Sequence, residues 1–169
     1  MTDEVAPQLR LVQVFLKAAT FSHRGEPIML APNTAQPAQS CGVAFTIFDL
    51  QPKNIEATSD ASIPGSAPVL ITVEVSTSPE TAPDALYDFS VEMAAIIEKD
   101  DDAARALDQD RLLEIGGALL YPYVREAVSN LTIRGRFGPV WLNPYNVRGA
   151  VKSMREAEEK RVTATGTSG

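Results

Sequence analysis

The apolar side chains change their spacing once along this chain, and this change restricts the folds open to it. Up to residue 97 they recur at every second position in separate short segments, which is typical of β-strands. Beyond the acidic run at residues 98–102 they recur every three or four positions, which is typical of an amphipathic helix. This order predicts an α+β protein with its strands first and its helices second.

Four strands are predicted from the alternation and from the turn residues that separate them. They cover residues 9–21, 42–50, 69–76 and 86–97, with Ile55 as the furthest end of the second. Segments rich in proline, glycine and serine connect them at residues 23–40, 58–68 and 78–83. Short connections between the strands favour an antiparallel meander. The first strand differs from the others, because its middle is apolar on both faces.

Two helices are predicted after the strands. The long one spans residues 112–135 and is interrupted or kinked near Pro122. An extended piece at residues 139–144 leads to a second helix from about Asn146 to Lys160. We therefore expect residues 1–160 to form a single domain and residues 161–169, which are small and polar, to form a disordered tail.

Composition excludes several classes of partner. The formal charge is −7, from 22 acidic and 15 basic side chains, so binding to nucleic acid is not expected. No apolar run approaches the ~20 residues that span a bilayer, and the acidic start lacks the basic region of a signal peptide. We expect a cytoplasmic protein without membrane insertion.

Catalytic and metal sites are not indicated either, and no cofactor is expected. Cys41 and His23 are the only residues of their types, so no disulfide can form within the chain, and the ligands of a thiolate metal site are absent. Cys41 opens an apolar strand and is interpreted as a small buried side chain rather than a nucleophile. The acidic run lacks the spacing of a calcium-binding loop and is interpreted as a solvated loop or a helix start.

The second half of the chain carries a family resemblance. Residues 120–126, Leu-Tyr-Pro-Tyr-Val-Arg-Glu, precede Arg-Gly-Arg-Phe at residues 134–137 and Trp-Leu-Asn-Pro-Tyr-Asn-Val at residues 141–147. This order and spacing resembles the C-terminal half of the SecB family of protein-export chaperones, over about a third of the chain. The resemblance implies a four-stranded antiparallel sheet with a long helix and a second C-terminal helix on one side, assembled as a homotetramer, a dimer of dimers.

The function that the resemblance implies is that of an ATP-independent chaperone, a holdase, which binds unfolded polypeptide clients in protein export and is not an enzyme. Position in the matching crossover and second helix gives seven candidates for the client-binding groove. They are Tyr121, Trp141, Leu142, Tyr145, Val147, Val151 and Met154. For Tyr121 and Leu142, a place in the core is the competing interpretation. Arg125 and Glu126 are expected to pair or to satisfy nearby backbone groups.

Two other functions stay open. The first is a SecB-like chaperone dedicated to one client, such as an antitoxin, and not coupled to the SecA ATPase. Family members that deliver preproteins to SecA use acidic side chains on the sheet, and the matching positions here are Ala18, Ser22 and Ser90. Binding to SecA is therefore doubtful, although Asp88 and Glu92 lie nearby on the same strand face as Ser90.

The second is a small-molecule-binding or enzymatic α+β domain. The sequence lacks a glycine-rich phosphate loop, a cluster of metal ligands and a nucleophile–base pair. A deep pocket with a strongly perturbed acid beside His23 would support this alternative.

Overall fold

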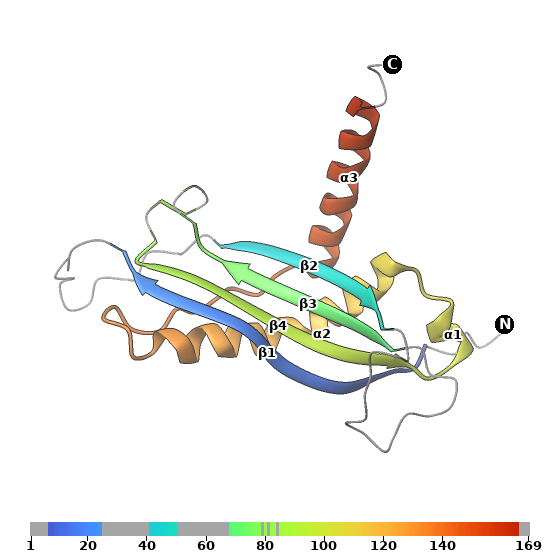
Figure 1. Ribbon diagram of the computed structural model, residues 1–169, viewed down its shortest axis with the longest axis horizontal. Helices are drawn as coiled ribbons and strands as arrows, with labels where there is room; N and C mark the ends of the chain where they lie inside the picture. Colours follow the sequence, from blue (N-terminus) through green and yellow to red (C-terminus); the bar gives the residue numbers. More distant parts are fainter. Residues whose placement is uncertain are drawn as a thin grey trace.

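The computed structural model describes residues 7–24, 41–50, 68–78, 80, 82–83 and 85–165 (Figure 1). Its strands are β1 (Leu9–His23), β2 (Gly42–Asp49), β3 (Val69–Ser76) and β4 (Tyr87–Lys99). Its helices are α1 (Asp102–Arg105), α2 (Gln109–Thr132) and α3 (Val147–Thr165). The α+β class and the four strands predicted from the alternation are confirmed. Most of the connections predicted at residues 23–40 and 58–68, and the extension to Ile55, lie outside the described residues.

The four strands form one antiparallel sheet in the order β1-β4-β3-β2. Strands β2, β3 and β4 follow one another as in the expected meander, but β1 pairs with β4 and not with β2. The lengths of the strands give a physical reason. The 15 residues of β1 match the 13 of β4, whereas β2 and β3 have eight each. Pairing the two long strands satisfies more backbone groups than pairing β1 with β2 would.

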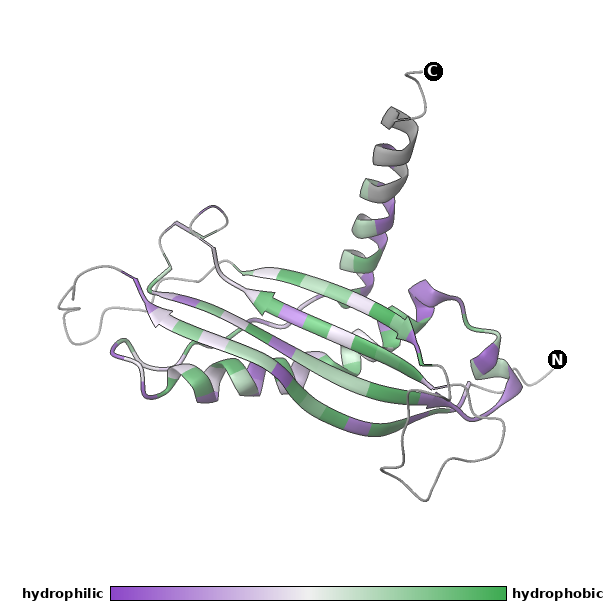
Figure 2. Cartoon of the chain, viewed as in Figure 1, coloured by the Kyte–Doolittle hydropathy of each residue, from purple (hydrophilic) through white to green (hydrophobic). Residues whose placement is uncertain are grey.

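One face of the sheet, the inner face, packs against α2. The odd-numbered side chains of β3 and β4 belong to this face and are buried, while the even-numbered ones belong to the outer face. Hydrophobic and hydrophilic residues accordingly alternate along parts of these strands (Figure 2). Gly117 of α2 lets the helix approach, because a Cβ atom there would lie 2.8 Å from Val147 Cγ1 and 2.9 Å from Phe45 Cε1. The inner face and α2 thus form the core, with Ile71, Leu120 and Val124 almost fully buried.

Strand β1 departs from simple alternation. Its register with β4 shifts between Leu11 and Gln13 and again between Leu16 and Ala18. Each shift is an irregularity of the β-bulge kind, which reverses the face on which the following side chains lie. Leu16, at the second shift, is 53% exposed. The apolar character on both faces that the sequence indicated therefore coincides with these shifts.

The acidic run divides between two elements. Glu98 ends the buried part of β4 and forms an ion pair with Arg10 of β1. Asp101 caps α1, where its Oδ1 accepts from the Ala104 N–H at 2.6 Å. Asp108 caps α2 in the same way, with 2.7 Å from its Oδ1 to the Arg111 nitrogen. The run is thus a strand end followed by a helix start, which corrects the interpretation of Glu98 as part of a loop.

The helices differ in how they meet the sheet. Helix α2 continues through Pro122 and lies along the sheet, whereas α3 projects away from it past β2 (Figure 1). Helix α3 runs to Thr165, five residues beyond the expected end at Lys160, and residues 166–169 lie outside the described residues.

Candidate functional site

The crossover, residues 133–146, joins α2 to α3 and is anchored at its start by two buried hydroxyl groups. Thr132 Oγ1 donates to the Val128 carbonyl at 2.8 Å and accepts from the Val140 N–H at 2.8 Å. Tyr87 Oη accepts from the Phe137 N–H at 2.7 Å and donates to the Gly138 carbonyl at 3.0 Å. Burial raises the pKa of Tyr87, so the phenol stays protonated and able to donate near neutral pH.

Two side chains of α2 anchor the middle of the crossover. Arg125 Nε donates to the Leu142 carbonyl at 2.8 Å, and Tyr121 Oη donates to the Asn143 carbonyl at 2.8 Å. The expectation that Arg125 satisfies nearby backbone groups is confirmed. Consecutive carbonyls of an extended segment are therefore held against the helix, which fixes the position of the residues that follow.

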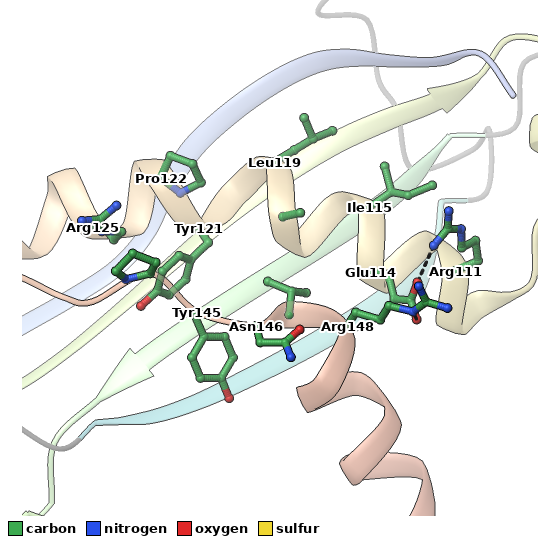
Figure 3. Close-up of a pocket in the computed structure, with 13 residues that line it drawn as sticks. Arg111, Glu114, Ile115, Leu119, Tyr121, Pro122, Arg125, Tyr145, Asn146 and Arg148 are labelled. Atoms are coloured by element: carbon green, nitrogen blue, oxygen red, sulfur yellow. Dashed lines mark hydrogen bonds and ion pairs between the residues drawn. The ribbon is translucent and has the colours of Figure 1, made fainter. Parts of the chain in front are cut away.

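An open groove of about 600 Å³ lies between α2, the end of the crossover and the first turn of α3 (Figure 3). Its walls combine apolar side chains with a few charged ones. It is lined by Arg111, Glu114, Ile115, Ala118, Leu119, Tyr121, Pro122, Arg125, Pro144, Tyr145, Asn146, Val147 and Arg148. Mostly apolar walls with a few polar groups are the composition expected of a site that binds an amphipathic ligand.

Tyr145 occupies the boundary of this groove. Its ring centroid lies 5.5 Å from that of Tyr121 and 6.1 Å from that of Phe45 on β2. The side chain is 39% exposed, so one side of the ring packs on aromatic neighbours while the remainder contacts solvent. A supported, half-exposed aromatic ring of this kind can bury apolar surface of a bound chain at little cost in conformational entropy.

Two smaller hollows lie at the base of α3. One, of about 320 Å³, is lined by Phe45, Val151 and Met154 together with residues of β2 and α2. The other, of about 580 Å³, contains Tyr145 and Met154. Because Tyr145 also lines the groove, and Met154 lines both hollows, the apolar surface continues from the groove around the base of α3.

The seven predicted groove residues separate into four sets in the structure. Tyr121, Tyr145 and Val147 line the groove, and Val151 and Met154 line the hollows. Leu142 belongs to the core, as its competing interpretation had it. Trp141 is 72% exposed on the crossover and does not line any of these three cavities. Tyr121, Val147 and Val151 are largely buried, so they support the surface more than they offer area to a ligand.

On the α2 side of the groove, sequence reasoning identified Tyr121 but not its neighbours on the helix. Ile115 and Leu119 belong to the apolar residues whose spacing predicted the helix, and both line the groove, with Leu119 41% exposed. Helical spacing predicts that apolar residues share a face but does not predict whether anything covers that face. No pattern in the sequence predicts that three charged residues of the groove, Arg111, Glu114 and Arg148, lie close together.

Cys41 lies just before β2, and His23 is the last residue of β1. Burial raises the pKa of the Cys41 thiol to about 11, which leaves it protonated at neutral pH and poorly nucleophilic. The ring of His23 belongs to an aromatic cluster with Phe21, Tyr87 and Phe137, away from the residues that line the groove. Within the described part of the chain, no group of three or more His, Cys, Asp or Glu side chains is placed to hold a metal ion.

Comparison with known proteins extends over both halves of the fold. The family described as "Preprotein translocase subunit SecB" matches residues 2–157, which include every strand and the crossover. The chain belongs to the SecB family. A SecB protein-export protein of Alcanivorax borkumensis is 26% identical over 174 residues, covering 98% of each chain. The SecB of Chromohalobacter salexigens is 30% identical over 107 residues, which cover 51% of this chain and 65% of that protein.

Among solved structures, this SecB-family chain is similar to the SecB-like chaperone of Mycobacterium tuberculosis in complex with a peptide from the HigA1 antitoxin. The identity is 19%, the alignment covers 81% of this chain and 90% of the other, and the TM-score is 0.45. Among the helices of the described residues, we find none long and apolar enough to cross a membrane.

Proposed function

We propose that this SecB-family protein is an ATP-independent holdase, which binds unfolded polypeptides in the cytoplasm during protein export, and that it is a binding protein and not an enzyme. The observation that carries the proposal is the family match over residues 2–157. The groove and the hollows supply a physical basis. They present half-exposed apolar and aromatic side chains, including Leu119, Tyr145 and Met154, on which a client can bury apolar surface without nucleotide.

The acidic composition supports this role. A chaperone that exposes apolar surface must stay soluble when loaded, and a net charge of −7 provides repulsion between complexes. Trp141 adds to the binding surface in the proposal, because a single large aromatic side chain that is 72% exposed on an anchored segment is suited to contact a client.

We further propose a dimer of dimers. Outside the groove, exposed large apolar side chains lie on β1, at one edge of the sheet, and on or just after the last turns of α2. The first set contains Leu11, Val12 and Leu16, and the second contains Tyr123 and Ile133. Exposed apolar patches together with an edge strand are typical of subunit interfaces.

A second candidate, a chaperone dedicated to one client and not coupled to SecA, is favoured by the outer face of the sheet. Ala18 and Ser22 of β1 pair in register with Glu92 and Asp88 of β4. Both carboxylates have basic partners: Lys17 Nζ lies 2.7 Å from Glu92 Oε1, and Arg24 Nε lies 2.5 Å from Asp88 Oδ1. The acidic side chains that pair in register with Ala18 and Ser22 are therefore already matched by basic ones. At the third matching position, Ser90 Oγ donates to Glu74 Oε1 at 2.8 Å.

The test of the holdase function is suppression of aggregation. An unfolded reporter polypeptide is diluted from denaturant with and without the purified protein, in the absence of ATP, and light scattering is followed. The proposal expects the scattering to fall as the chaperone approaches an equal concentration of subunits. Scattering unaffected by a large excess of the protein would exclude it.

A further inference from the structure

Two methionines lie in the described part of the chain, and their surroundings differ. The Met93 side chain belongs to the hydrophobic core and is 8% exposed, whereas Met154 of α3 is 42% exposed. The other two methionines of the sequence, Met1 and Met29, lie outside the described residues. Of the two described thioethers, Met154 is thus the one that a small molecule in solution reaches without any opening of the core.

Met154 lies where the two hollows at the base of α3 meet. In the smaller hollow it shares the walls with Phe45 and Val151, and in the larger one with Val43 and Tyr145. Among the described residues it is the one that both hollows have in common. A change in the polarity of this side chain therefore alters the apolar surface of both hollows at once.

The smaller hollow has polar walls as well as apolar ones. Thr46 and Gln109 line it and carry a hydroxyl and an amide group, both of which can donate a hydrogen bond. Arg155 Nε lies 2.5 Å from Asp110 Oδ1 in the same lining. A thioether sulfur is only a weak acceptor, but an oxygen atom bonded to it is a strong one. The hollow can thus hold a polar, oxidised form of the Met154 side chain.

Cys41 carries the other sulfur atom that an oxidant could attack, but its thiol reacts slowly. Burial raises the pKa of this thiol to about 11, and the thiolate is the form that peroxides oxidise. A thioether has no proton to lose, so the reactivity of Met154 follows from its exposure. Exposure and protonation state together favour Met154 over Cys41 and Met93.

We propose that Met154 is an oxidation-sensitive site, and that its conversion to methionine sulfoxide weakens client binding. The inference rests on the proposed holdase function and adds a regulation to the same surface. The oxidant is a peroxide such as hydrogen peroxide. Its O–O bond breaks, one oxygen atom bonds to Sδ, the sulfur loses two electrons, and the other oxygen leaves as water. Two thiols reverse the step, with a disulfide and water as products.

The sulfoxide changes the surface that a client meets. It replaces a flexible apolar side chain beside Phe45 and Tyr145 by a polar one. A client that buries apolar surface there must remove water from the S–O group, which makes the free energy of binding less favourable. Loss of one apolar contact of this size lowers affinity about three- to tenfold.

The experiment oxidises the purified full-length protein with hydrogen peroxide, removes the peroxide, and then adds a dye-labelled polypeptide that carboxymethylation of its cysteines keeps unfolded. Peptide mass spectrometry follows each methionine, and fluorescence anisotropy gives the affinity before and after treatment. We expect Met154 to be oxidised before Met93, and the affinity to fall about three- to tenfold. Methionine sulfoxide reductase with dithiothreitol should restore the affinity. Dithiothreitol alone, which reduces a sulfenic acid or a disulfide of Cys41, should not.

Two variants assign the effect to one sulfur atom. Met154→Leu keeps an apolar side chain but removes the sulfur, so its affinity, whatever the starting value, should be the same before and after peroxide. Met93→Leu is the matched control, because it makes the same change in the core, and it should stay as sensitive as the unaltered protein. Sensitivity that persists in Met154→Leu would assign the effect to Met1, Met29 or Cys41 and overturn the proposal.

The remaining outcomes separate this inference from the proposed function. Full client affinity of a protein whose Met154 is oxidised would overturn the regulation alone, and so would oxidation of Met93 before Met154. An untreated protein that neither binds the unfolded polypeptide nor suppresses aggregation would overturn the holdase function and the regulation with it.

Discussion

Lys17 Nζ lies 2.7 Å from Glu92 Oε1 across the β1–β4 pair, on the outer face of the sheet. The ammonium group compensates the carboxylate that would otherwise be available to a basic partner. We predict weak or no binding to the basic, zinc-bearing tail of SecA. Exposed ion pairs contribute only about 0.2–1 kcal/mol each, and few carboxylates on this face are left to form them with SecA. Calorimetric titration of the protein with this tail measures the affinity directly.

The same pair provides a test by substitution. Lys17→Ala frees Glu92 and should strengthen any residual binding to the SecA tail, whereas Lys152→Ala, on α3, should not. A sub-micromolar, salt-sensitive affinity of the unaltered protein would show instead that Asp88 and Glu92 serve as the acidic contacts despite their basic partners.

Client binding should depend on Trp141 and Tyr145, the two exposed aromatic side chains of the crossover. The double variant Trp141→Ala, Tyr145→Ala is predicted to weaken client affinity about tenfold or more, since buried aromatic contacts contribute about 1 kcal/mol or more each. The oligomer should stay intact. Phe48→Ala is the control, because Phe48 is 50% exposed on the outer face of β2. Unchanged affinity in the double variant would remove both residues from the binding surface.

The hydrogen bond from Tyr121 to the Asn143 carbonyl should stabilise the crossover. Tyr121→Phe keeps the ring but leaves that carbonyl without its donor, and we predict a loss of about 0.5–1.5 kcal/mol in the free energy of unfolding. Urea titration followed by circular dichroism measures the loss. The control is Tyr123→Phe, two residues further along α2, where the side chain is 42% exposed. This change should lower the free energy of unfolding by far less. Equal effects of the two changes would show that the Tyr121 hydroxyl does not anchor the crossover.

Helix α2 should not tolerate a larger side chain at Gly117. Gly117→Val places methyl groups against Val147 and Phe45, and overpacking of this kind costs about 1–3 kcal/mol. A decrease of several degrees in Tm is expected. Ala118→Val, at the next and exposed position, controls for the lower helix propensity of valine. A Gly117→Val protein as stable as the Ala118→Val protein would disprove the close packing.

Subunit association is the last prediction. Light scattering at micromolar concentration should give a tetramer, or at least a dimer, because the exposed apolar side chains of β1 and α2 need partners. Leu16→Asp introduces a charge on the β1 edge and should lower the mass, while Phe48→Asp on the outer face should not. A stable monomer of the unaltered protein would contradict the proposed assembly.

The sequence by itself predicted the elements well, because periodicity is a local property. The strand at residues 69–76 was placed to the residue, and the long helix was displaced by about three residues, since its cap at Asp108 precedes the apolar stripe. The motif around Tyr121, Arg125 and Leu142 also predicted the family, because the residues that hold the crossover lie in one continuous segment, in contacts that span 17 and 22 positions.

Only the tertiary structure decided which strands are neighbours and which apolar surfaces stay open. The pairing of β1 with β4 joins residues more than sixty positions apart, and it depends on matched strand lengths and two register shifts that no local pattern reveals. The groove likewise brings Arg148 of α3 beside Glu114 of α2. A side chain's type determines what it can bind, but the packing of distant segments determines whether it is covered, and Leu119 is accordingly exposed while Leu120 is buried.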